Sequence, residues 1–335
     1  MARFFKLLLA GGLVLAAVVG LLYLIPSDEY IFLPDKAQPL APYVTVQGER
    51  SDHDGGGIYY VAVEVKKASL LEKLFPGLHE GSTLVPAAAV VSPGQSDKQH
   101  QRQELQAMAQ SQEIGAAVAL KALGYRVPVT SPGTVIADVN PHGPSAGKLR
   151  ASDTIAAVDG HPTPSLPALR RQITKHSPGQ NVSLTVRRNG TVRTVRVKTA
   201  PDPQDKRRSI IGVLTSCALQ TASKIRLPVP VHIDLGRVGG PSAGLAFALD
   251  VAEKLGHDVD RGHKVVASGE MCLDGSVVPV GGLKQKTIGA RRAGADVFLV
   301  PAGENAQEAR RYAGKMRVIP VHTYRQALHA LTTLK

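Results

Sequence analysis

Aromatic residues make up only 4% of this 335-residue chain, and cysteine occurs only twice, as Cys217 and Cys272. Two cysteines cannot complete a zinc site, and neither lies in a C-x-x-C motif. The sequence has no basic strand with interleaved aromatic residues that would stack on nucleic acid bases. We therefore predict no metal, no cofactor and no nucleic-acid partner. The net charge of +13 then indicates a basic surface that also favours membrane phosphates.

The composition is that of a folded protein, with 43% hydrophobic and 20% charged residues. The chain is too long for one ordinary core, so two or three domains are expected. Cys217 and Cys272 either form one disulfide outside the cytoplasm or remain a buried free pair, and the sequence leaves both possibilities open.

Residues 7–25 contain no charged side chain and follow Arg3 and Lys6. A run of this length can cross a bilayer as a helix. No small-x-small cleavage site follows it, which favours a retained anchor over a cleaved signal peptide. Positive charges before the run and acids after it place the N-terminus in the cytoplasm. We predict a single-pass cell-membrane protein with its anchor at 1–27 and its later domains outside the cytoplasm.

The region after the anchor mixes strand and helix patterns. Alternation predicts a strand at 58–65, and residues 67–75 are typical of a helix. Residues 99–123 repeat apolar side chains with the period of a helix that ends at Gly124. We expect residues 28–124 to pack with the module that follows them.

The strings TVIADVNPHGPSAGKLRASDTIAAVDGHP and NVSLTVRRNGTVRTVRVKTA lie in the next block, residues 125–200. Their order of strands, turns and one helix resembles a PDZ domain. In such a domain a peptide end adds as a strand beside a helix, unless the module only packs against its neighbour. The candidate peptide-binding residues are Thr134, Val135, Ile136, Leu169 and Ile173.

The string Gly-Pro-Ser-Ala-Gly occurs at 143–147 and again at 240–244. The first copy lies in a turn of the PDZ-like block, where Ser145 is structural. It also lacks the earlier glycine of a phosphate-binding loop, so we predict no nucleotide site. The second copy follows a polar segment at 201–208, which predicts a linker, and lies in the dense helix and strand pattern of 209–335.

Ser242, in the second copy, precedes the apolar pattern of a buried helix at 243–255. Free N–H groups and the positive end of the helix dipole lie at such an N-terminus, where they stabilise an alkoxide and an oxyanion. The backbone N–H groups of Ser242 and Ala243 are candidates for the oxyanion hole, whereas Pro241 has none. This pattern alone leaves open that Ser242 is only a helix cap.

A serine nucleophile needs a base. On a helical wheel of residues 283–293, Lys286 lies on the apolar face with Leu283 and Ala290. Burial lowers the pKa of a lysine, so a neutral Lys286 can take the proton from a serine. A side chain that reaches out to solvent is the alternative for a lone lysine.

Four strings in order resemble the proteolytic domain of Lon-type proteases: GPSAG, SGE at 268–270, DG at 274–275 and PVGGLKQK, which ends at Lys286. The resemblance implies a catalytic dyad of Ser242 and Lys286, with Ser268 supporting the lysine. Gly239 departs from the family pattern, in which an Asp is frequent before Gly-Pro-Ser.

The order of anchor, PDZ-like block and Lon-type domain resembles a membrane-anchored, PDZ-containing subgroup of these proteases that lacks an ATPase domain. This resemblance implies an α+β fold and an ATP-independent serine endopeptidase in a homo-oligomer. Its PDZ-like module would bind the ends of peptide or protein substrates. Two alternatives remain open: a catalytically silent peptide-binding scaffold, and an α/β-hydrolase-like esterase that uses His263, His322 or His329.

Overall fold

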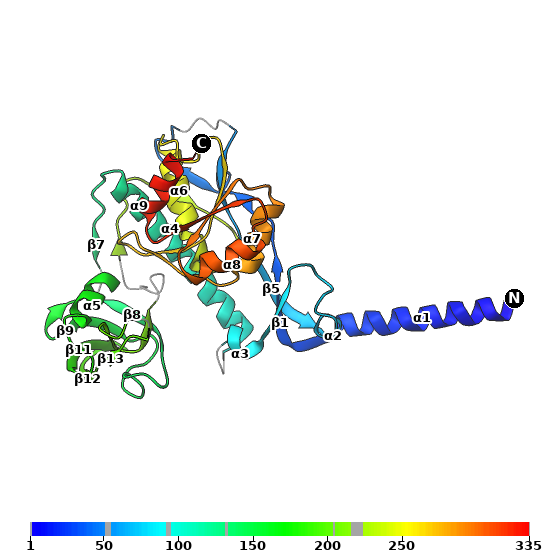
Figure 1. The fold of residues 1–335 in the computed structure, drawn as a ribbon, viewed down its shortest axis with the longest axis horizontal. Helices are drawn as coiled ribbons and strands as arrows, with labels where there is room; N and C mark the ends of the chain where they lie inside the picture. Colours follow the sequence, from blue (N-terminus) through cyan, green and yellow to red (C-terminus); the bar gives the residue numbers. More distant parts are fainter. Residues whose placement is uncertain are drawn as a thin grey trace.

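The structure is a computed structural model that describes residues 2–50, 55–91, 95–130, 133–203, 205–215 and 224–334. Figure 1 shows helix α1 (Ala2–Leu24) extending away from a main body, with a smaller module beside that body. Helices and strands are mixed throughout the main body, which confirms the predicted fold class.

The main body is built on one sheet of five strands in the order β2-β4-β18-β21-β22. The inner strands are parallel, and successive side chains of a strand face opposite sides. Val265 and Ala267 belong to one apolar core, whereas Val266 between them belongs to another. The strands are β2 (Gln38–Pro39), β4 (Gly57–Tyr60), β18 (Lys264–Ala267), β21 (Val297–Pro301) and β22 (Arg317–Val321).

Helices cover both faces of this sheet. α4 (Asp97–Ala122), α6 (Gly244–Lys254) and α9 (Tyr324–Thr332) contribute to the first core. α7 (Leu283–Arg292) and α8 (Glu304–Tyr312) contribute to the second. Every residue of α6 is buried, as its apolar pattern predicted, and the predicted helices at 99–123 and 283–293 are confirmed to within two residues.

A second sheet lies between α1 and the main body. Its central strand β1 (Pro26–Pro34) pairs with β5 (Val63–Ser69) and β6 (Thr83–Pro86), and short helices α2 (Leu70–Leu74) and α3 (Ala87–Val90) follow these strands. The helix predicted at 67–75 begins late, because pairing with β1 keeps the chain extended as far as Ser69. Two further ribbons are β3 (Val44–Val46) with β17 (Val231–Ile233), and β19 (Glu270–Met271) with β20 (Val277–Val278).

The smaller module, here called the inserted module, comprises residues 133–215 and is built around a further apolar core, to which Cys272 and Val278 of the main body also contribute. Its sheet has the order β12-β11-β9-β8-β15, so β15 forms one edge. The elements are β8 (Thr134–Val139), β9 (Thr154–Val158), β10 (His161–Pro162), α5 (Leu166–Ile173), β11 (Asn181–Arg188), β12 (Thr191–Lys198), β13 (Ala200–Pro201), β14 (Ser209–Ile210) and β15 (Val213–Thr215). A ribbon of β7 (Val129–Thr130) and β16 (Lys224–Ile225) connects the module to the main body.

The inserted module interrupts the main body, because the chain leaves after α4 and returns at β16. Leu40, Ile58 and Met108 from before the interruption share one core with Phe247 and Leu299 from after it. The structure thus differs from the predicted packing of residues 28–124 against the PDZ-like block. The physical reason is that the apolar faces of β4 and α4 are buried by β18 and α6.

The predicted linker at 201–208 also differs from what the structure contains. Strand β13, which ends at Pro201, pairs with β14, which begins at Ser209. Most of the polar segment therefore forms the loop of a hairpin inside the inserted module. Its Pro and charged residues mark a turn at the surface, a pattern that also occurs in linkers between domains.

Candidate active site

Two hydrogen bonds with α4 hold the loop that carries Ser242 before α6 begins. Ser242 lies in a 3-10 turn over Pro241–Ala243, and Gly240 before it has a φ of +89°, which favours glycine. The Gly240 N–H donates to the Glu104 carbonyl at 2.9 Å, and the Ser111 hydroxyl donates to the Pro241 carbonyl at 2.8 Å. Helix α4, from the other side of the insertion, therefore positions this loop.

Lys286 reaches Ser242 from the buried face of α7. Its side chain is 4% exposed, and its Nζ lies 2.6 Å from the Ser242 Oγ. Burial lowers the Lys286 pKa to about 7, since the ammonium loses its water without gaining a carboxylate partner. The structure thus brings together the serine and the lysine that were predicted separately, with the lysine near the midpoint of its titration at neutral pH.

Ser268 lies at the end of β18 and is fully buried. Its Oγ accepts a hydrogen bond from Lys286 Nζ at 3.1 Å and donates to the Ser242 carbonyl at 3.2 Å. The Gly269 N–H donates to that same carbonyl at 2.8 Å. Ser268 can therefore fix the lysine and the serine backbone with one hydroxyl group.

The first N–H groups of a 3-10 turn have no acceptor within the turn. In the turn at Pro241–Ala243 these positions are the proline, which has no N–H, followed by Ser242 and Ala243. The two N–H groups proposed for the oxyanion hole thus lie at the start of the turn. Their role stays a prediction.

Ser242 and Lys286 lie in a cleft of ≈ 940 Å³. One wall comes from β1, β5 and α4, and the other from the loops at 237–243 and 279–282. Sequence reasoning missed the first wall entirely. The strings that identified the dyad lie after residue 240, and the earlier residues carry no comparable motif.

Glu104 explains why glycine stands at position 239. A Cβ on Gly239 would lie 2.7 Å from the Glu104 Cβ, which is too close for two carbon atoms. Oε2 of Glu104 lies 3.1 Å from the position that a Cβ on Gly240 would occupy. Helix α4 therefore supplies the cleft with a carboxylate beside the serine loop. In the sequence pattern from which Gly239 departs, the frequent Asp would place a carboxylate in the loop itself.

We expect Gly239→Asp to slow acylation of Ser242 by at least about 100-fold, because the loop must shift and misplace Ser242. Gly281→Ala is the matched control: this glycine also lines the cleft, but its added Cβ would meet nothing within 4 Å. Thermal unfolding would show whether both variants still fold. Normal activity in Gly239→Asp would contradict the tight contact with Glu104.

Two family models match the chain: the PDZ domain over residues 121–199, and the Lon protease (S16) C-terminal proteolytic domain over residues 215–333. The chain carries a PDZ domain and a Lon-type proteolytic domain. The second match begins near the end of the inserted module and covers the loop of Ser242 and helix α7.

Curated relatives of the proteolytic domain are longer proteins. Lon protease 1 of Sorangium cellulosum is 39% identical over 83 residues, which are 24% of this chain and 10% of the relative. Lon protease of Chloroflexus aggregans is 37% identical over 107 residues, 30% of this chain and 13% of the relative. The matching segment thus spans about a tenth of each relative.

Among solved structures, the PDZ domain of an SdrC-like protein from Listeria innocua is similar to this chain. It is 24% identical and covers 25% of this chain and 92% of that chain, with a TM-score of 0.23. Because the TM-score is this low, we draw no conclusion about this chain from that structure.

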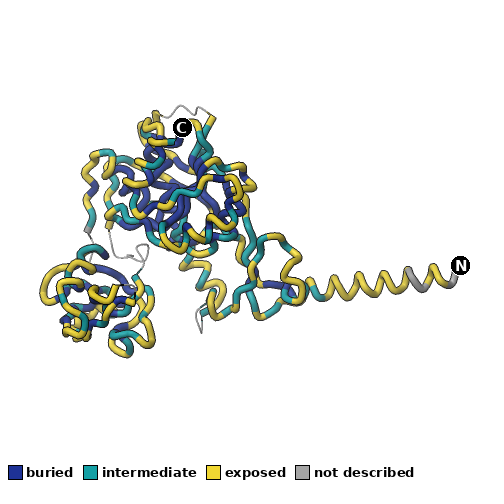
Figure 2. The backbone as a smooth tube through the Cα atoms, in the orientation of Figure 1, coloured by how far each residue is buried: buried dark blue, intermediate teal, exposed yellow. Residues whose placement is uncertain are grey.

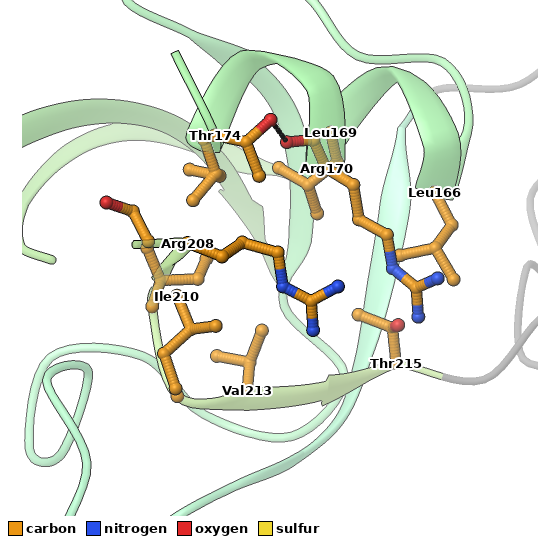
Figure 3. A pocket seen from close by; sticks show the side chains of 12 residues that line it. Leu166, Leu169, Arg170, Thr174, Arg208, Ile210, Val213 and Thr215 are labelled. Carbon is orange, nitrogen blue, oxygen red and sulfur yellow. Dashed lines mark hydrogen bonds between the residues drawn. The ribbon is translucent and has the colours of Figure 1, made fainter. Parts of the chain in front are cut away.

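The PDZ domain has a groove of ≈ 290 Å³ between α5 and the segment at 208–215. Figure 3 shows Leu166 and Leu169 of the helix on one side and Ile210 and Val213 on the other. The guanidinium group of Arg170 also lines the groove, and its positive charge has no ion-pair partner among the described residues.

The structure corrects one wall of the predicted groove. Leu169 and Ile173 line it as predicted, but Thr134, Val135 and Ile136 do not, because β15 pairs with β8 and takes the edge position. These three residues are buried inside the sheet. Residues after the predicted linker thus complete the PDZ domain. The order of motifs along the sequence did not indicate that the chain comes back to pair with β8.

The remaining predictions concern isolated residues. Ser145 is buried, and its hydroxyl donates to the Ile211 carbonyl at 2.6 Å, in agreement with a structural role. The histidines that an esterase would need, His263, His322 and His329, do not line the cleft. Cys272 is disulfide-bonded, and Cys217 lies outside the described residues.

One group of acids could hold a metal ion on geometry alone. Carboxylate oxygens of Glu253, Asp258 and Asp260 lie within 4.8 Å of one another near the end of α6. The Oε2 of Glu253 already accepts hydrogen bonds from the N–H groups of Val259 and Asp260 at 2.7 and 3.1 Å. These bonds explain why the acids lie together, because the Glu253 carboxylate caps the turn that contains Val259 and Asp260. None of the three acids lines the cleft.

Proposed function

We propose that this protein is a membrane-anchored, ATP-independent serine endopeptidase in which Ser242 is the nucleophile and Lys286 the general base. The observation that carries the proposal is the 2.6 Å contact between the buried Lys286 Nζ and the Ser242 Oγ. A Lon-type proteolytic domain and a lysine pKa of about 7 support the same reaction.

In the proposed mechanism, neutral Lys286 takes the proton of Ser242 as its oxygen attacks a peptide carbonyl. The N–H groups of Ser242 and Ala243 stabilise the oxyanion. The Lys286 ammonium then gives its proton to the leaving amine. Water, activated by the same lysine, hydrolyses the acyl-enzyme and restores Ser242. Ser268 holds the lysine in place throughout through its hydrogen bond.

The test is degradation of an unfolded protein by the full chain in detergent, without nucleotide, beside Ser242→Ala. We expect the unchanged chain to cut at the same rate with and without ATP, since no step of the mechanism uses nucleotide. Strict dependence on ATP would overturn the ATP-independent proposal. Equal inactivity of the unchanged chain and the variant would favour the silent scaffold.

We infer that α1 anchors the protein in the cell membrane, with the catalytic domain outside the cytoplasm. Residues Phe4–Leu24 have a mean hydropathy of 2.5, and none of those whose exposure is described is buried (Figure 2). Lys6 precedes most of the helix, and Asp28 and Glu29 follow it, which favours an N-terminus in the cytoplasm.

We propose that the PDZ domain binds the ends of substrates at the edge of β15. No strand among the described residues pairs with the outer edge of β15, so a peptide can add there, and Leu166, Leu169 and Val213 give the groove apolar lining. Figure 3 shows the guanidinium groups of Arg170 and Arg208 beside this groove. Arg208 is paired with Asp202, so Arg170 is the cation that favours a peptide carboxylate.

We expect Ile210→Glu, on the groove wall, to slow degradation of a full-length protein at least about tenfold more than hydrolysis of a short peptide. Val192→Glu is the matched control, because Val192 lies on β12 at the opposite edge of the same sheet, is 59% exposed and does not line the groove. Steady-state rates on both substrates give the ratio. An equal ratio in the two variants would contradict a role of the groove in substrate binding.

A further inference from the structure

Three large apolar side chains are exposed close together in sequence at the end of α2 and directly after it: Leu74, Phe75 and Leu78, here called the apolar patch. They are 61%, 57% and 50% exposed. Among the described residues beyond α1 and Ile25, the other exposed large apolar side chains are single residues far apart in sequence. A local cluster of this kind marks an interaction surface.

The apolar patch is attached to the end of α1. The Leu70 N–H donates to the Ile25 carbonyl at 2.9 Å, and α2 contacts α1. Lys73 of α2 forms an ion pair with Asp28, just beyond α1. Figure 1 shows α2 at the base of the long helix. The position of the patch relative to α1 is therefore set by hydrogen bonds and charge.

The patch is also ordered by its own contacts. Ser69 and Glu72 cap α2 reciprocally, which fixes the start of the helix. The Leu78 N–H donates to the Phe75 carbonyl at 3.0 Å, and the Ser82 hydroxyl donates to the Pro76 carbonyl at 3.1 Å. The exposed side chains thus belong to a compact turn, where their exposure must be offset by a partner.

The distance from α1 identifies that partner. The five residues of α2 span about 7.5 Å at the rise of an α-helix. The polar interfacial layer of a bilayer is about 5–8 Å thick on each side. Whatever the direction of α2, Leu74 at its end therefore lies within or at the edge of this layer when α1 spans the membrane. Phe75 follows Leu74 directly, and the turn that bonds the Leu78 N–H to the Phe75 carbonyl keeps Leu78 nearby.

We propose that Leu74, Phe75 and Leu78 insert into the interfacial layer of the membrane that α1 spans, which rests on the proposed anchoring of α1. The neighbouring cations Lys66, Lys67 and Lys73 each have a carboxylate partner. The patch therefore offers apolar area rather than free positive charge, and its insertion does not require anionic lipid.

This contact holds the cleft close to the membrane surface. Lys67 of β5 lines the cleft and is separated from Leu70 of α2 by only about 10 Å of strand. With α1 and the apolar patch both in the membrane, the second sheet is fixed at two points instead of one. The part of the cleft lined by β5 then lies nearest the membrane surface.

The sequence has no tryptophan, so a single introduced tryptophan reports on its own surroundings. The full chain would be placed in phosphatidylcholine vesicles with and without brominated lipid. Three variants are compared: Phe75→Trp in the patch, Val14→Trp in α1, and Leu214→Trp as a matched control whose residue is 65% exposed, against 57% for Phe75, but lies in the PDZ domain. We expect brominated lipid to quench Val14→Trp and Phe75→Trp strongly, and to leave Leu214→Trp unchanged.

Each other outcome overturns the proposal in a different way. If Val14→Trp is quenched and Phe75→Trp is not, α1 is anchored and the patch does not insert. If Val14→Trp is not quenched, the anchoring itself is wrong. Blue-shifted but unquenched emission from Phe75→Trp would mean that protein, such as a second copy of the chain, covers the patch.

Discussion

Replacement of Ser242 by alanine, or of Lys286 by methionine, should lower the rate of peptide hydrolysis by at least about 10³-fold. In the proposed mechanism, the first change removes the attacking oxygen, and the second removes the group 2.6 Å away that takes its proton. The two residues act as a unit, so the double variant should be no slower than the slower single variant. Initial rates on an unfolded protein and on a short peptide measure these effects.

Lys284→Met is the matched control for the lysine. Lys284 lies on the same helix, but its Nζ donates to the Ser82 carbonyl at 2.8 Å and not to the serine loop. Its loss should leave most of the activity, whereas Lys286→Met should not. If Ser242→Ala still cuts at the normal rate, the assignment of the nucleophile is wrong.

Activity should rise with pH through an apparent pKa of about 7, because only neutral Lys286 can accept the serine proton. Below that value kcat/KM should fall about tenfold per pH unit. The cause is burial, which removes water from the ammonium group. A rate that does not change between about pH 5 and pH 9 would exclude Lys286 as the base.

The same lowered pKa makes stability depend on pH in a defined direction. The folded lysine titrates at about 7 and the unfolded one at 10.5, so between these values the unfolded state binds more protons. The free energy of unfolding should therefore rise with pH from about 7 to about 10. Lys286→Met should be more stable than the unchanged chain at neutral pH, by up to about 4 kcal/mol.

Urea unfolding of both chains at about pH 7 and pH 9 measures this difference. The stability gain of Lys286→Met should shrink as the pH rises, while its activity stays lost at both values. A less stable Lys286→Met would mean that the hydrogen bonds to Ser242 and Ser268 outweigh the cost of burying the amine.

Local sequence patterns determined the helices that carry the chemistry. The period of apolar residues in α4, α6 and α7 predicted these helices nearly to their ends, since each buries one continuous face or its whole surface. The wheel of α7 also placed Lys286 inward, which the structure confirms. The short-range strings around Ser242 and Ser268 sufficed to name the residues that meet there.

Only the tertiary structure decided which distant segments share a core and a cleft. Pairing of β4 with β18, and packing of α4 on α6, join residues on both sides of the PDZ domain. Such contacts depend on the shapes and apolar faces of two segments at once, so neither sequence segment encodes them alone. For the same reason the cleft wall at Glu104 and the edge strand β15 of the peptide groove were visible only in three dimensions.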